Sequence, residues 1–324
     1  MDVVHVMRRP QGGHNYSLET LFATVRSALP ADIAARAATA PYPSRGLARR
    51  VGNVAWAARL RGDVLHVTGD ILYVTPALRG PTVITVPDVG WVNRGWAATA
   101  MYDTLWLAVP ARHADIVTTI SAFTRTELLA RVGCDPRKVR VIHCCVDPAF
   151  APAPPREQTA RATVLAVGTT ANKNIERLCA ALEGLSATLH IVGPLTIRQR
   201  DAIVRHDVRA VNSVGLTMAQ LVDAYRNADV VAFPSLYEGF GLPIVEAQAV
   251  GRPVVTSNVA AMPEVAGDAA CLVDPTEVAS IRRGLQRVLD DASYRAELRE
   301  RGFANMRRFS PRAIAEQYAS AYRE

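Results

Sequence analysis

Two carboxylates, Glu238 and Glu246, stand close together in the most distinctive stretch of the chain, FPSLYEGFGLPIVEAQAVG at 233–251. The neighbours of Glu246 are nearly all apolar, which predicts a buried helix that carries one carboxylate. A buried charge without hydrogen-bond donors is very costly. The hydroxyls of a bound sugar would supply such donors, and a salt bridge to an arginine would explain the residue equally well.

The glycines between the two carboxylates predict a ligand-binding turn. Gly239 and Gly241 follow a buried strand, and the missing side chains let backbone N–H groups approach a ligand closely. Pro243 stands at the expected first position of a helix and Gly251 at its C-cap. Because the N-terminus of a helix favours negative charge, this turn suits an anionic ligand.

A second candidate element, VGTTANKNI at 167–175, has the pattern of a strand end, a glycine turn and a helix start with Asn174 as N-cap. Backbone amides after Gly168, the helix dipole and the ammonium of Lys173 can converge there on a phosphate. Lys138 is the other lysine among the 37 basic residues. A surface lysine on a helix cap is the alternative, but the scarcity of lysine makes us favour a functional Lys173.

Short apolar runs alternate with helical patterns along the whole chain, which predicts parallel sheets built from βαβ units. The expected strands are Val3–Met7, Val64–Thr68, Thr82–Val86, Ile116–Thr119, Val139–Ile142, Thr163–Val167, Thr188–Val192, Val230–Phe233, Pro253–Thr256 and Cys271–Val273. Helical spacing connects two apolar sets between them: Ile175, Leu178, Leu182 and Leu185, and then Met218, Leu221 and Tyr225.

A proline-rich stretch at 148–155 cannot continue a helix or a central strand and is interpreted as a linker. We therefore expect two Rossmann-like, doubly wound α/β domains, 1–150 and 151–309. They are expected to face a central cleft at the carboxyl ends of their strands, where such folds bind ligands. The helix at 310–324 is expected to pack back on the first domain.

Composition narrows the class of protein. Hydrophobic residues make up 49% of the chain, as in globular proteins, and no apolar run reaches the length of a transmembrane helix. The first residues lack the basic-then-apolar layout of a signal peptide. The five cysteines include no Cys-x-x-Cys pair, which argues against a disulfide framework or a zinc site. We expect a cytoplasmic protein with reduced thiols and no bound metal.

The spacing Glu238-x7-Glu246 within Tyr-Glu-Gly-Phe-Gly-Leu-Pro resembles the signature of the family 4 (group 1) retaining glycosyltransferases, which have the GT-B fold. The stretches at 251–258 and 262–267 resemble that family as well. The resemblance implies that Glu238 contacts the donor sugar and that Glu246 holds the ribose hydroxyls. It also implies backbone contacts to the sugar and diphosphate from Gly239, Phe240, Gly241 and Leu242.

The turn around Lys173 resembles a branch of the same family whose lysine binds the donor diphosphate. The donor-binding positions implied here are Gly168, Thr169 and Lys173. The family often has an arginine in place of Thr169, so the second cation is open and Arg177 is a candidate. Since departure of a nucleoside diphosphate builds negative charge, a fixed cation stabilises the transition state. Lys173 and Glu238 are therefore our first candidates for catalysis.

The first half resembles the family less closely. Three segments match in the right order: 65–70, 85–88 and 119–123. Gly12 and Gly13 follow the first strand and are expected to contact the donor phosphates, with a plain turn as the alternative. Relatives often carry His-Asp where this chain has Pro87 and Asp88, and Asp88 remains a candidate catalytic residue.

Tryptophan and arginine gather in the first half. All four tryptophans lie there, and arginines flank an apolar helical set at 51–58. Basic residues with tryptophan can dock a helix on an anionic membrane. We hypothesise a peripheral contact with the cytoplasmic membrane face, near a lipid-linked acceptor. A core-packed helix with a solvated basic face is the alternative.

The resemblance implies a retaining, metal-independent transfer of a hexose-type sugar from a UDP- or GDP-sugar to an acceptor glycan or lipid-linked glycan, in cell-envelope or polysaccharide biosynthesis. No motif residue is an obvious nucleophile, so front-face attack is expected, with no cofactor beyond the donor substrate. The alternatives are a silent GT-B protein that binds nucleotide-sugars and another GT-B enzyme, such as an epimerase or a phosphorylase. Nucleic-acid binding lacks a recognised motif.

Overall fold

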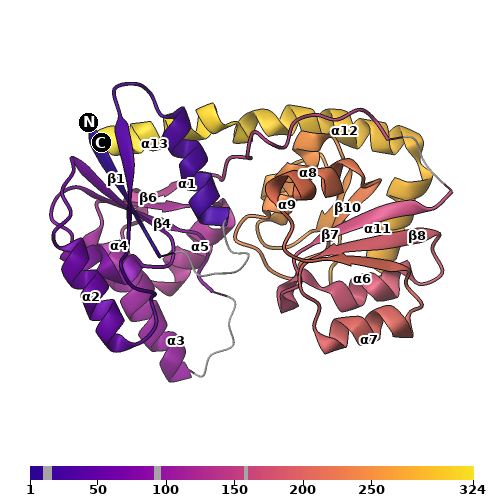
Figure 1. The fold of residues 1–324 in the computed structure, drawn as a ribbon, viewed down its shortest axis with the longest axis horizontal. Helices are drawn as coiled ribbons and strands as arrows, with labels where there is room; N and C mark the ends of the chain where they lie inside the picture. Colours follow the sequence, from indigo (N-terminus) through magenta and orange to yellow (C-terminus); the bar gives the residue numbers. More distant parts are fainter. Residues whose placement is uncertain (10–16, 91–95, 157–159) are drawn as a thin grey trace. The chain divides into compact units, whose positions relative to one another are not determined.

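The computed structural model describes residues 1–9, 17–90, 96–156 and 160–324. The chain divides into two compact units: unit 1 comprises Met1–Cys145 and Ser310–Glu324, and unit 2 comprises Val146–Phe309. Each unit consists of a parallel sheet with helices on its faces, the α/β class predicted from the alternating apolar runs (Figure 1).

The sheet of unit 1 runs in the order β2-β1-β3-β4-β5-β6. Its strands are β1 (Asp2–Met7), β2 (Ala34–Thr39), β3 (Val64–Thr68), β4 (Thr82–Val86), β5 (Ile116–Thr119) and β6 (Val139–Val141). Its helices are α1 (Ser17–Ala28), α2 (Leu47–Ala57), α3 (Trp96–Tyr102), α4 (Val109–His113), α5 (Ala122–Arg131) and α13 (Pro311–Arg323), with the short helices η1 (Leu72–Ala77), η2 (Asp103–Ala108) and η3 (Pro136–Lys138). The strand order reverses between β1 and β3.

The two faces of this sheet differ in chemistry because successive side chains alternate between them. One face is apolar and packs among α2, η1 and α4 through residues such as Val4, Val6, Leu65, Val67, Ile84 and Val86. The other face is polar and lies against α13. There His5 Nε2 and His66 Nδ1 lie 3.0 and 2.7 Å from the Tyr322 hydroxyl, and His66 Nε2 lies 2.7 Å from Thr85 Oγ1.

The sheet of unit 2 runs in the order β12-β11-β10-β7-β8-β9 and reverses between β7 and β10. Its strands are β7 (Ala162–Val167), β8 (Ala187–Val192), β9 (Ala210–Ser213), β10 (Val230–Phe233), β11 (Val254–Ser257) and β12 (Cys271–Val273). Its helices are α6 (Ile175–Leu182), α7 (Ile197–Arg205), α8 (Met218–Arg226), α9 (Leu242–Val250), α10 (Met262–Ala266), α11 (Val278–Asp290) and α12 (Ala292–Met306), with the short helices η4 (Ala171–Lys173) and η5 (Arg307–Phe309). This strand order is that of the dinucleotide-binding folds.

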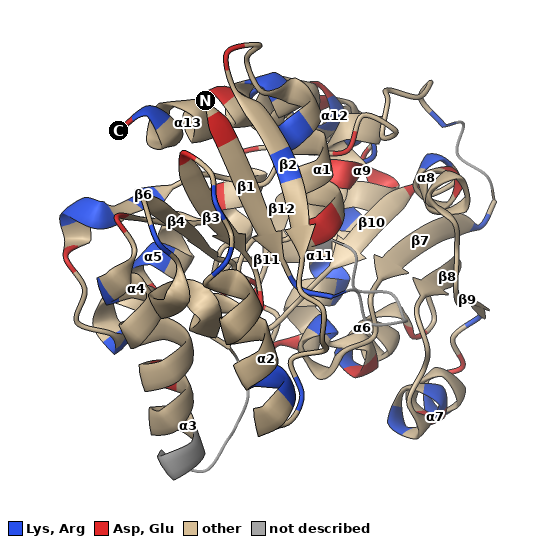
Figure 2. Ribbon diagram, turned by 60° about the vertical axis from the view of Figure 1, so that its left-hand side comes forward, with Lys and Arg blue, Asp and Glu red and all other residues tan. Residues whose placement is uncertain are grey.

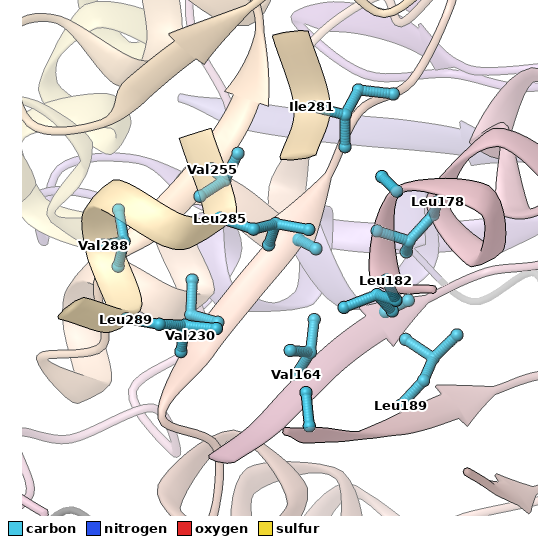
Figure 3. Close-up of a cluster of buried hydrophobic side chains, with 14 of the residues drawn as sticks. Val164, Leu178, Leu182, Leu189, Val230, Val255, Ile281, Leu285, Val288 and Leu289 are labelled. Carbon is cyan, nitrogen blue, oxygen red and sulfur yellow. The ribbon is translucent and has the colours of Figure 1, made fainter. Parts of the chain in front are cut away.

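A buried apolar cluster gives unit 2 a rigid scaffold. Val164, Val230 and Val255 on neighbouring strands pack against Leu178 of α6 and Leu285 of α11 (Figure 3). All five side chains are fully buried. Burial of each such side chain contributes roughly 1.5–3 kcal/mol. The loops that follow β7 and β10 therefore begin from strands whose side chains pack in the buried core of unit 2.

Every strand expected from the apolar runs is present, with ends within one residue of the expected ones. The strands that sequence reasoning missed are β2 and β9, which both lie at sheet edges. Their residues, AARAAT and AVNS, are all at least partly exposed. An edge strand is not buried on both faces and so needs no continuous apolar run, which was the pattern used to find the others.

The proline-rich stretch at 148–155, expected to be a linker, directly follows the boundary between the units at Cys145 and Val146 and packs on unit 2. Phe150 is buried and meets Tyr225 edge-on, with ring centroids 5.3 Å apart. The backbone N–H of Ala153 donates to the carbonyl of Val250 at 3.1 Å. Proline excludes a helix interior or a central strand, but an irregular segment rich in proline can still pack closely on a core.

Candidate functional site

The candidate site of unit 2 lies at the carboxyl edge of its sheet, where the strand order reverses. Lys173 belongs to the turn after β7, and Glu238 belongs to the loop after β10. Lys173 Nζ donates to Glu238 Oε1 at 2.7 Å, and Asn172 Nδ2 donates to the same oxygen at 3.0 Å. The side chains of the ion pair are only 17% and 15% exposed. Solvent therefore screens this pair less than it screens a surface pair.

Backbone geometry and an aromatic ring position Lys173. Gly168 has a φ of 90°, and a Cβ atom added to it would lie 2.8 Å from Lys173 Cε. The aliphatic stem of the lysine thus passes directly over Gly168, which only a residue without a side chain allows. The ammonium lies 4.5 Å from the centre of the Phe233 ring, a distance typical of cation–π contacts.

Two asparagines connect the turn after β7 to neighbouring loops. Asn172 Nδ2 also donates to the carbonyl of Tyr237 at 2.9 Å. Asn174 Nδ2 donates to the carbonyls of Pro234 at 3.0 Å and Pro275 at 2.7 Å. Asn174 stands at the N-cap of α6 as predicted, but its φ is 60° and its side chain makes no capping hydrogen bond. Its amide therefore joins three loops of the site rather than capping the helix.

The glycine turn leads into a helix with the predicted C-cap and a start one residue before the predicted one. α9 begins at Leu242, has Pro243 in its first turn and ends at Val250, with Gly251 as its C-cap at a φ of 80°. Gly241 precedes the helix with a φ of 107°, a conformation that residues with a side chain rarely adopt. Because α9 follows β10, its N-terminus and its positive dipole end lie at the same sheet edge as Lys173.

The side chain of Phe240 fixes the glycine turn to the core of unit 2. Its ring is buried and meets Phe309 edge-on, with centroids 5.6 Å apart. Gly239, the preceding residue, is partly exposed. The turn is therefore fixed by one aromatic side chain while the backbone beside it is accessible to solvent.

Glu246 lies on α9 and accepts a hydrogen bond from the Tyr225 hydroxyl at 2.5 Å. Among the described residues no arginine pairs with it, so the salt-bridge explanation from the sequence is wrong. Burial raises the pKa of Glu246 to about 7, although the Tyr225 hydrogen bond and the Lys173 charge act in the opposite direction. The carboxyl group thus changes charge near neutral pH and keeps lone pairs for a ligand.

Thr169 and Arg177 each make a hydrogen bond within the loops around Lys173. Thr169 Oγ1 donates to the carbonyl of Pro194 at 2.7 Å, so this side chain is engaged with the turn after β8. Arg177 is exposed on α6, and its Nη1 donates to Asn174 Oδ1 at 3.1 Å. Within the part of the chain that the structure describes, Lys173 is the cation paired with Glu238.

The candidate residues of the first half belong to unit 1. Asp88 follows β4, is exposed, and accepts a hydrogen bond on Oδ1 from the backbone N–H of Gly90 at 2.8 Å. Pro87 is partly exposed. Gly12 and Gly13 lie outside the described residues. In unit 2, by contrast, the structure brings the lysine, the glycine turn and both glutamates to one sheet edge.

Sequence reasoning missed Asn172, Tyr225 and Phe233 as parts of this site. Tyr225 was predicted only as an apolar member of a helix face, yet its fully buried hydroxyl bonds Glu246. A buried tyrosine hydroxyl usually has a partner, which was the available signal. Asn172 immediately precedes Lys173 and shares its contact with Glu238; nothing in its sequence position separates it from an ordinary turn residue.

This arrangement suits a ligand that carries both hydroxyl groups and negative charge. Glu238 and Glu246 accept hydrogen bonds, while Lys173 and the start of α9 offer positive charge. Among the described residues no group of three or more His, Cys, Asp and Glu side chains is arranged to hold a metal ion.

Models of known families match both halves of the chain. Residues 4–150 match the model of Glycosyltransferase Family 4, and residues 161–291 match that of Glycosyl transferases group 1. The chain belongs to the family 4 glycosyltransferases. The motif around Glu238 and Glu246, which suggested this family, lies within the second matched region.

Curated relatives of this family 4 glycosyltransferase include an MMP alpha-(1->4)-mannosyltransferase of Mycolicibacterium hassiacum. The two are 31% identical over 239 residues, which are 65% of this chain and 54% of the relative. O-antigen chain mannosyltransferase B of Escherichia coli is 43% identical over 99 residues, 31% of this chain and 26% of the relative. A glycogen synthase of Mycobacterium tuberculosis is 32% identical over 258 residues, 71% of this chain and 61% of the relative. The matched part is thus less than two thirds of each relative.

Solved structures give the fold of this glycosyltransferase. Sucrose-phosphate synthase from Thermosynechococcus elongatus matches with a TM-score of 0.80 and 19% identity over 100% of this chain and 98% of that one. HepE from Anabaena in complex with UDP-glucose matches with a TM-score of 0.79 and 17% identity over 99% of each chain. The family 4 glycosyltransferase therefore has the GT-B fold, as its motifs implied.

Proposed function

We propose that this protein transfers a hexose-type sugar, with retention of configuration, from a UDP- or GDP-sugar to an acceptor glycan or lipid-linked glycan of the cell envelope or of a polysaccharide. The observation that carries the proposal is the Lys173–Glu238 pair, which lies where the strand order of the unit 2 sheet reverses. Two of the relatives above are mannosyltransferases, which favours mannose as the sugar.

Each residue of the pair has a distinct proposed role. Lys173 binds the donor diphosphate and stabilises the negative charge that builds on it as the glycosidic bond breaks. Glu238, released from Lys173 by the diphosphate, accepts hydrogen bonds from the sugar hydroxyls. Glu246, oriented by Tyr225, accepts them from the ribose. The backbone of Gly168, Thr169 and the turn 239–242 contacts the phosphates and sugar.

We propose front-face transfer without a protein nucleophile and without a metal ion. Glu238 is held by two donors at one oxygen, which suits a binding role better than nucleophilic attack. Lys173 and the N-terminus of α9 supply the positive charge that the leaving group needs. In unit 1 we propose that Asp88 is a catalytic residue on the acceptor side. We also propose that Gly12 and Gly13 contact the donor phosphates.

Release of nucleoside diphosphate from a panel of UDP-, GDP- and dTDP-sugars, with and without acceptor extract, tests this proposal. We expect one donor to be turned over, and Lys173→Ala and Glu238→Ala to lower the rate by about 100-fold or more. Lys138→Ala is the matched control, because that lysine bonds the carbonyl of Ala114 in unit 1. If Lys173→Ala turned over donor as fast as Lys138→Ala, the assigned site would be wrong.

The alternative function is the binding of nucleotide-sugars without catalysis. Thr169, whose side chain is engaged with Pro194, and Pro87 in place of a histidine favour it. Calorimetry measures donor binding, and the release assay measures turnover. A catalytically inactive protein would bind a donor without releasing nucleoside diphosphate. An epimerase is recognised in the same panel by a donor that is converted without an acceptor. A phosphorylase is recognised by sugar phosphate that forms from a glycan and added inorganic phosphate.

We also propose that unit 1 contacts an anionic membrane surface. Leu47 and Val51 of α2 are 79% and 58% exposed, and Met101 and Leu105 of the neighbouring helical segment are 57% and 46% exposed. Arg50 joins these elements by stacking over Trp106 at 4.6 Å. Figure 2 shows Lys and Arg residues on α2. Apolar side chains beside arginines complement a bilayer of anionic lipids.

Flotation with vesicles of phosphatidylglycerol and phosphatidylcholine tests this contact. We expect salt-sensitive binding that Leu47→Asp with Val51→Asp abolishes. The control is Val204→Asp, an equally exposed valine of unit 2 at 79% exposure. No helix in the described part of the chain combines the length and hydropathy needed to cross a bilayer. Binding to neutral vesicles alone, or equal loss in the Val204 variant, would contradict the proposed surface.

A further inference from the structure

A basic pocket lies in unit 2 at the sheet edge opposite the candidate donor site. It has a volume of about 610 Å³, and its lining includes Arg156, Arg226 and Arg252. Arg226 ends α8, just before β10, and Arg252 follows α9, just before β11. The pocket is therefore at the amino ends of these strands, whereas Lys173 and Glu238 follow carboxyl ends. A volume of this size matches that of small-molecule pockets.

Positive charge exceeds negative charge around this pocket. Arg156 Nε pairs with Asp229 Oδ1 at 3.0 Å, and the side chain of Asp229 is 7% exposed. The other oxygen of Asp229 accepts from the backbone N–H of Thr163 at 2.7 Å. Arg226 is 3.9 Å from Asp223, whose side chain is 64% exposed. Such an exposed pair neutralises little charge. The buried carboxylate of Asp229 thus pairs with Arg156 and attracts Arg252, whereas Arg226 lies beside the exposed Asp223.

Arg252 carries a hydrogen-bond donor that no described residue accepts from. The residue is 6% exposed, and its Nη2 donates to the carbonyl of Arg226 at 2.8 Å. Its buried Nε has no acceptor among the described residues, and the same holds for Nε of Arg299. Burial, and then the charges of Arg156 and Arg299, lower the pKa of Arg252. These two Nε atoms are closed off from the pocket, so a ligand there meets instead the partly exposed guanidinium groups of Arg156 and Arg226.

We propose that this pocket binds the phosphoryl group of a small phosphorylated molecule. Guanidinium groups donate several N–H bonds in a fixed plane that matches phosphate oxygens. The pocket is also larger than inorganic phosphate alone requires, so it accommodates an attached group of sugar size. This site is separate from the proposed donor site and does not depend on the proposed transferase activity.

Titration calorimetry with inorganic phosphate and with glucose 6-phosphate tests the proposal on the full chain. We expect both probes to bind the unaltered protein, and Lys173→Ala to retain the binding at this pocket. Arg226→Gln removes an exposed guanidinium and should weaken binding by about tenfold or more. Arg252→Gln should weaken it further, with circular dichroism as the check on folding. Arg198→Gln, an exposed arginine of α7 outside the pocket, is the matched control and should bind normally.

Three outcomes would overturn this inference. Phosphate binding that Lys173→Ala abolishes and Arg226→Gln leaves intact would place the anion in the donor site alone. Binding of phosphatidylglycerol vesicles without binding of either soluble probe would assign the arginines to a lipid surface. Absence of binding at millimolar probe would remove the site. Donor turnover, measured separately in the same variants, is expected to be unchanged in Arg226→Gln, so failure of the transferase proposal is recognised independently.

Discussion

At the scale of single residues, the Tyr225–Glu246 pair determines the charge of the site near neutral pH. Burial raises the pKa of Glu246 to about 7, and the hydrogen bond from Tyr225 limits this rise. As the pH falls through 7 the carboxyl group takes up a proton and loses part of its capacity to accept hydrogen bonds. Donor affinity should therefore decline on the acid side of neutrality.

Tyr225→Phe tests this link between hydrogen bond and charge. Without the hydroxyl the pKa of Glu246 should rise by about one unit or more, because a hydrogen bond to a charged group contributes about 1.5–3 kcal/mol. We expect the donor KM to begin rising at a higher pH than in the unaltered enzyme, with kcat little changed. Tyr294→Phe, in the same unit, is the control. An unchanged pH profile of KM in Tyr225→Phe would show that the hydroxyl does not set the pKa of Glu246.

At the scale of elements, the turn after β7 works because one glycine leaves room for one lysine. Gly168 combines a φ of 90° with the passage of Lys173 across its α-carbon. Asn172 and Asn174 then connect this turn to the loops after β10 and β12. The position of the ammonium is therefore a property of the three loops together rather than of the lysine alone.

Gly168→Ala, compared with a control glycine, separates the loss of stability caused by a positive φ from the loss of activity caused by moving Lys173. The added Cβ would lie 2.8 Å from Lys173 Cε, so the lysine must move and turnover should fall by about 10-fold or more. Gly184→Ala is the matched control: its φ is 71°, and a Cβ there meets nothing within 4 Å. Both variants should lose about 1 kcal/mol of stability from the positive φ. Equal activity in the two variants, compared by donor turnover and thermal unfolding, would contradict the proposed packing.

At the scale of the whole molecule, the two units bury titratable groups of opposite kind. Unit 1 buries His5, whose pKa burial lowers to about 3, and His66, whose pKa burial lowers well below its usual value. Unit 2 holds Glu246 with its raised pKa on α9, and partial burial lowers the pKa of His190 on β8. A histidine kept neutral in the folded state and a carboxyl group kept protonated there couple stability to pH in opposite directions.

Acidification should therefore destabilise unit 1 and stabilise the α9 region of unit 2. Below about pH 6.5 unfolded histidine binds protons that folded His5 and His66 do not, so unit 1 loses up to about 1.4 kcal/mol per pH unit for each histidine. Folded Glu246 binds a proton below about pH 7 that the unfolded residue, with its pKa of 4.5, does not bind until lower pH.

Amide hydrogen exchange at about pH 7.5 and about pH 5.5, corrected for intrinsic rates, measures both effects. On going from the higher to the lower pH, protection of amide hydrogens should fall in β1 and β3 and rise in α9. Glu246→Gln should abolish the rise in α9 and leave unit 1 unaffected. A change of the same sign in both units would contradict the assignment of these groups.

Sequence alone determined the α/β class, the apolar strands and the candidate residues for donor binding. Buried strands must be continuously apolar, and a glycine turn before a helix has few substitutes, so these features can be read from local patterns. For the same reason the edge strands β2 and β9 escaped prediction: their partly exposed residues carry no such pattern.

Only the tertiary structure decided which groups meet. Glu238 was recognised from its motif, but its pairing with Lys173 joins loops 65 residues apart in sequence. Tyr225 was predicted only as an apolar helix residue. Its hydroxyl donates a hydrogen bond to Glu246, for which the sequence suggested an arginine as one possible partner. The strand order of the sheet brings the loops after β7 and β10 side by side, and neither that order nor the resulting contacts can be read from residue spacing. Local patterns therefore named the candidates, whereas the fold determined their partners and charges.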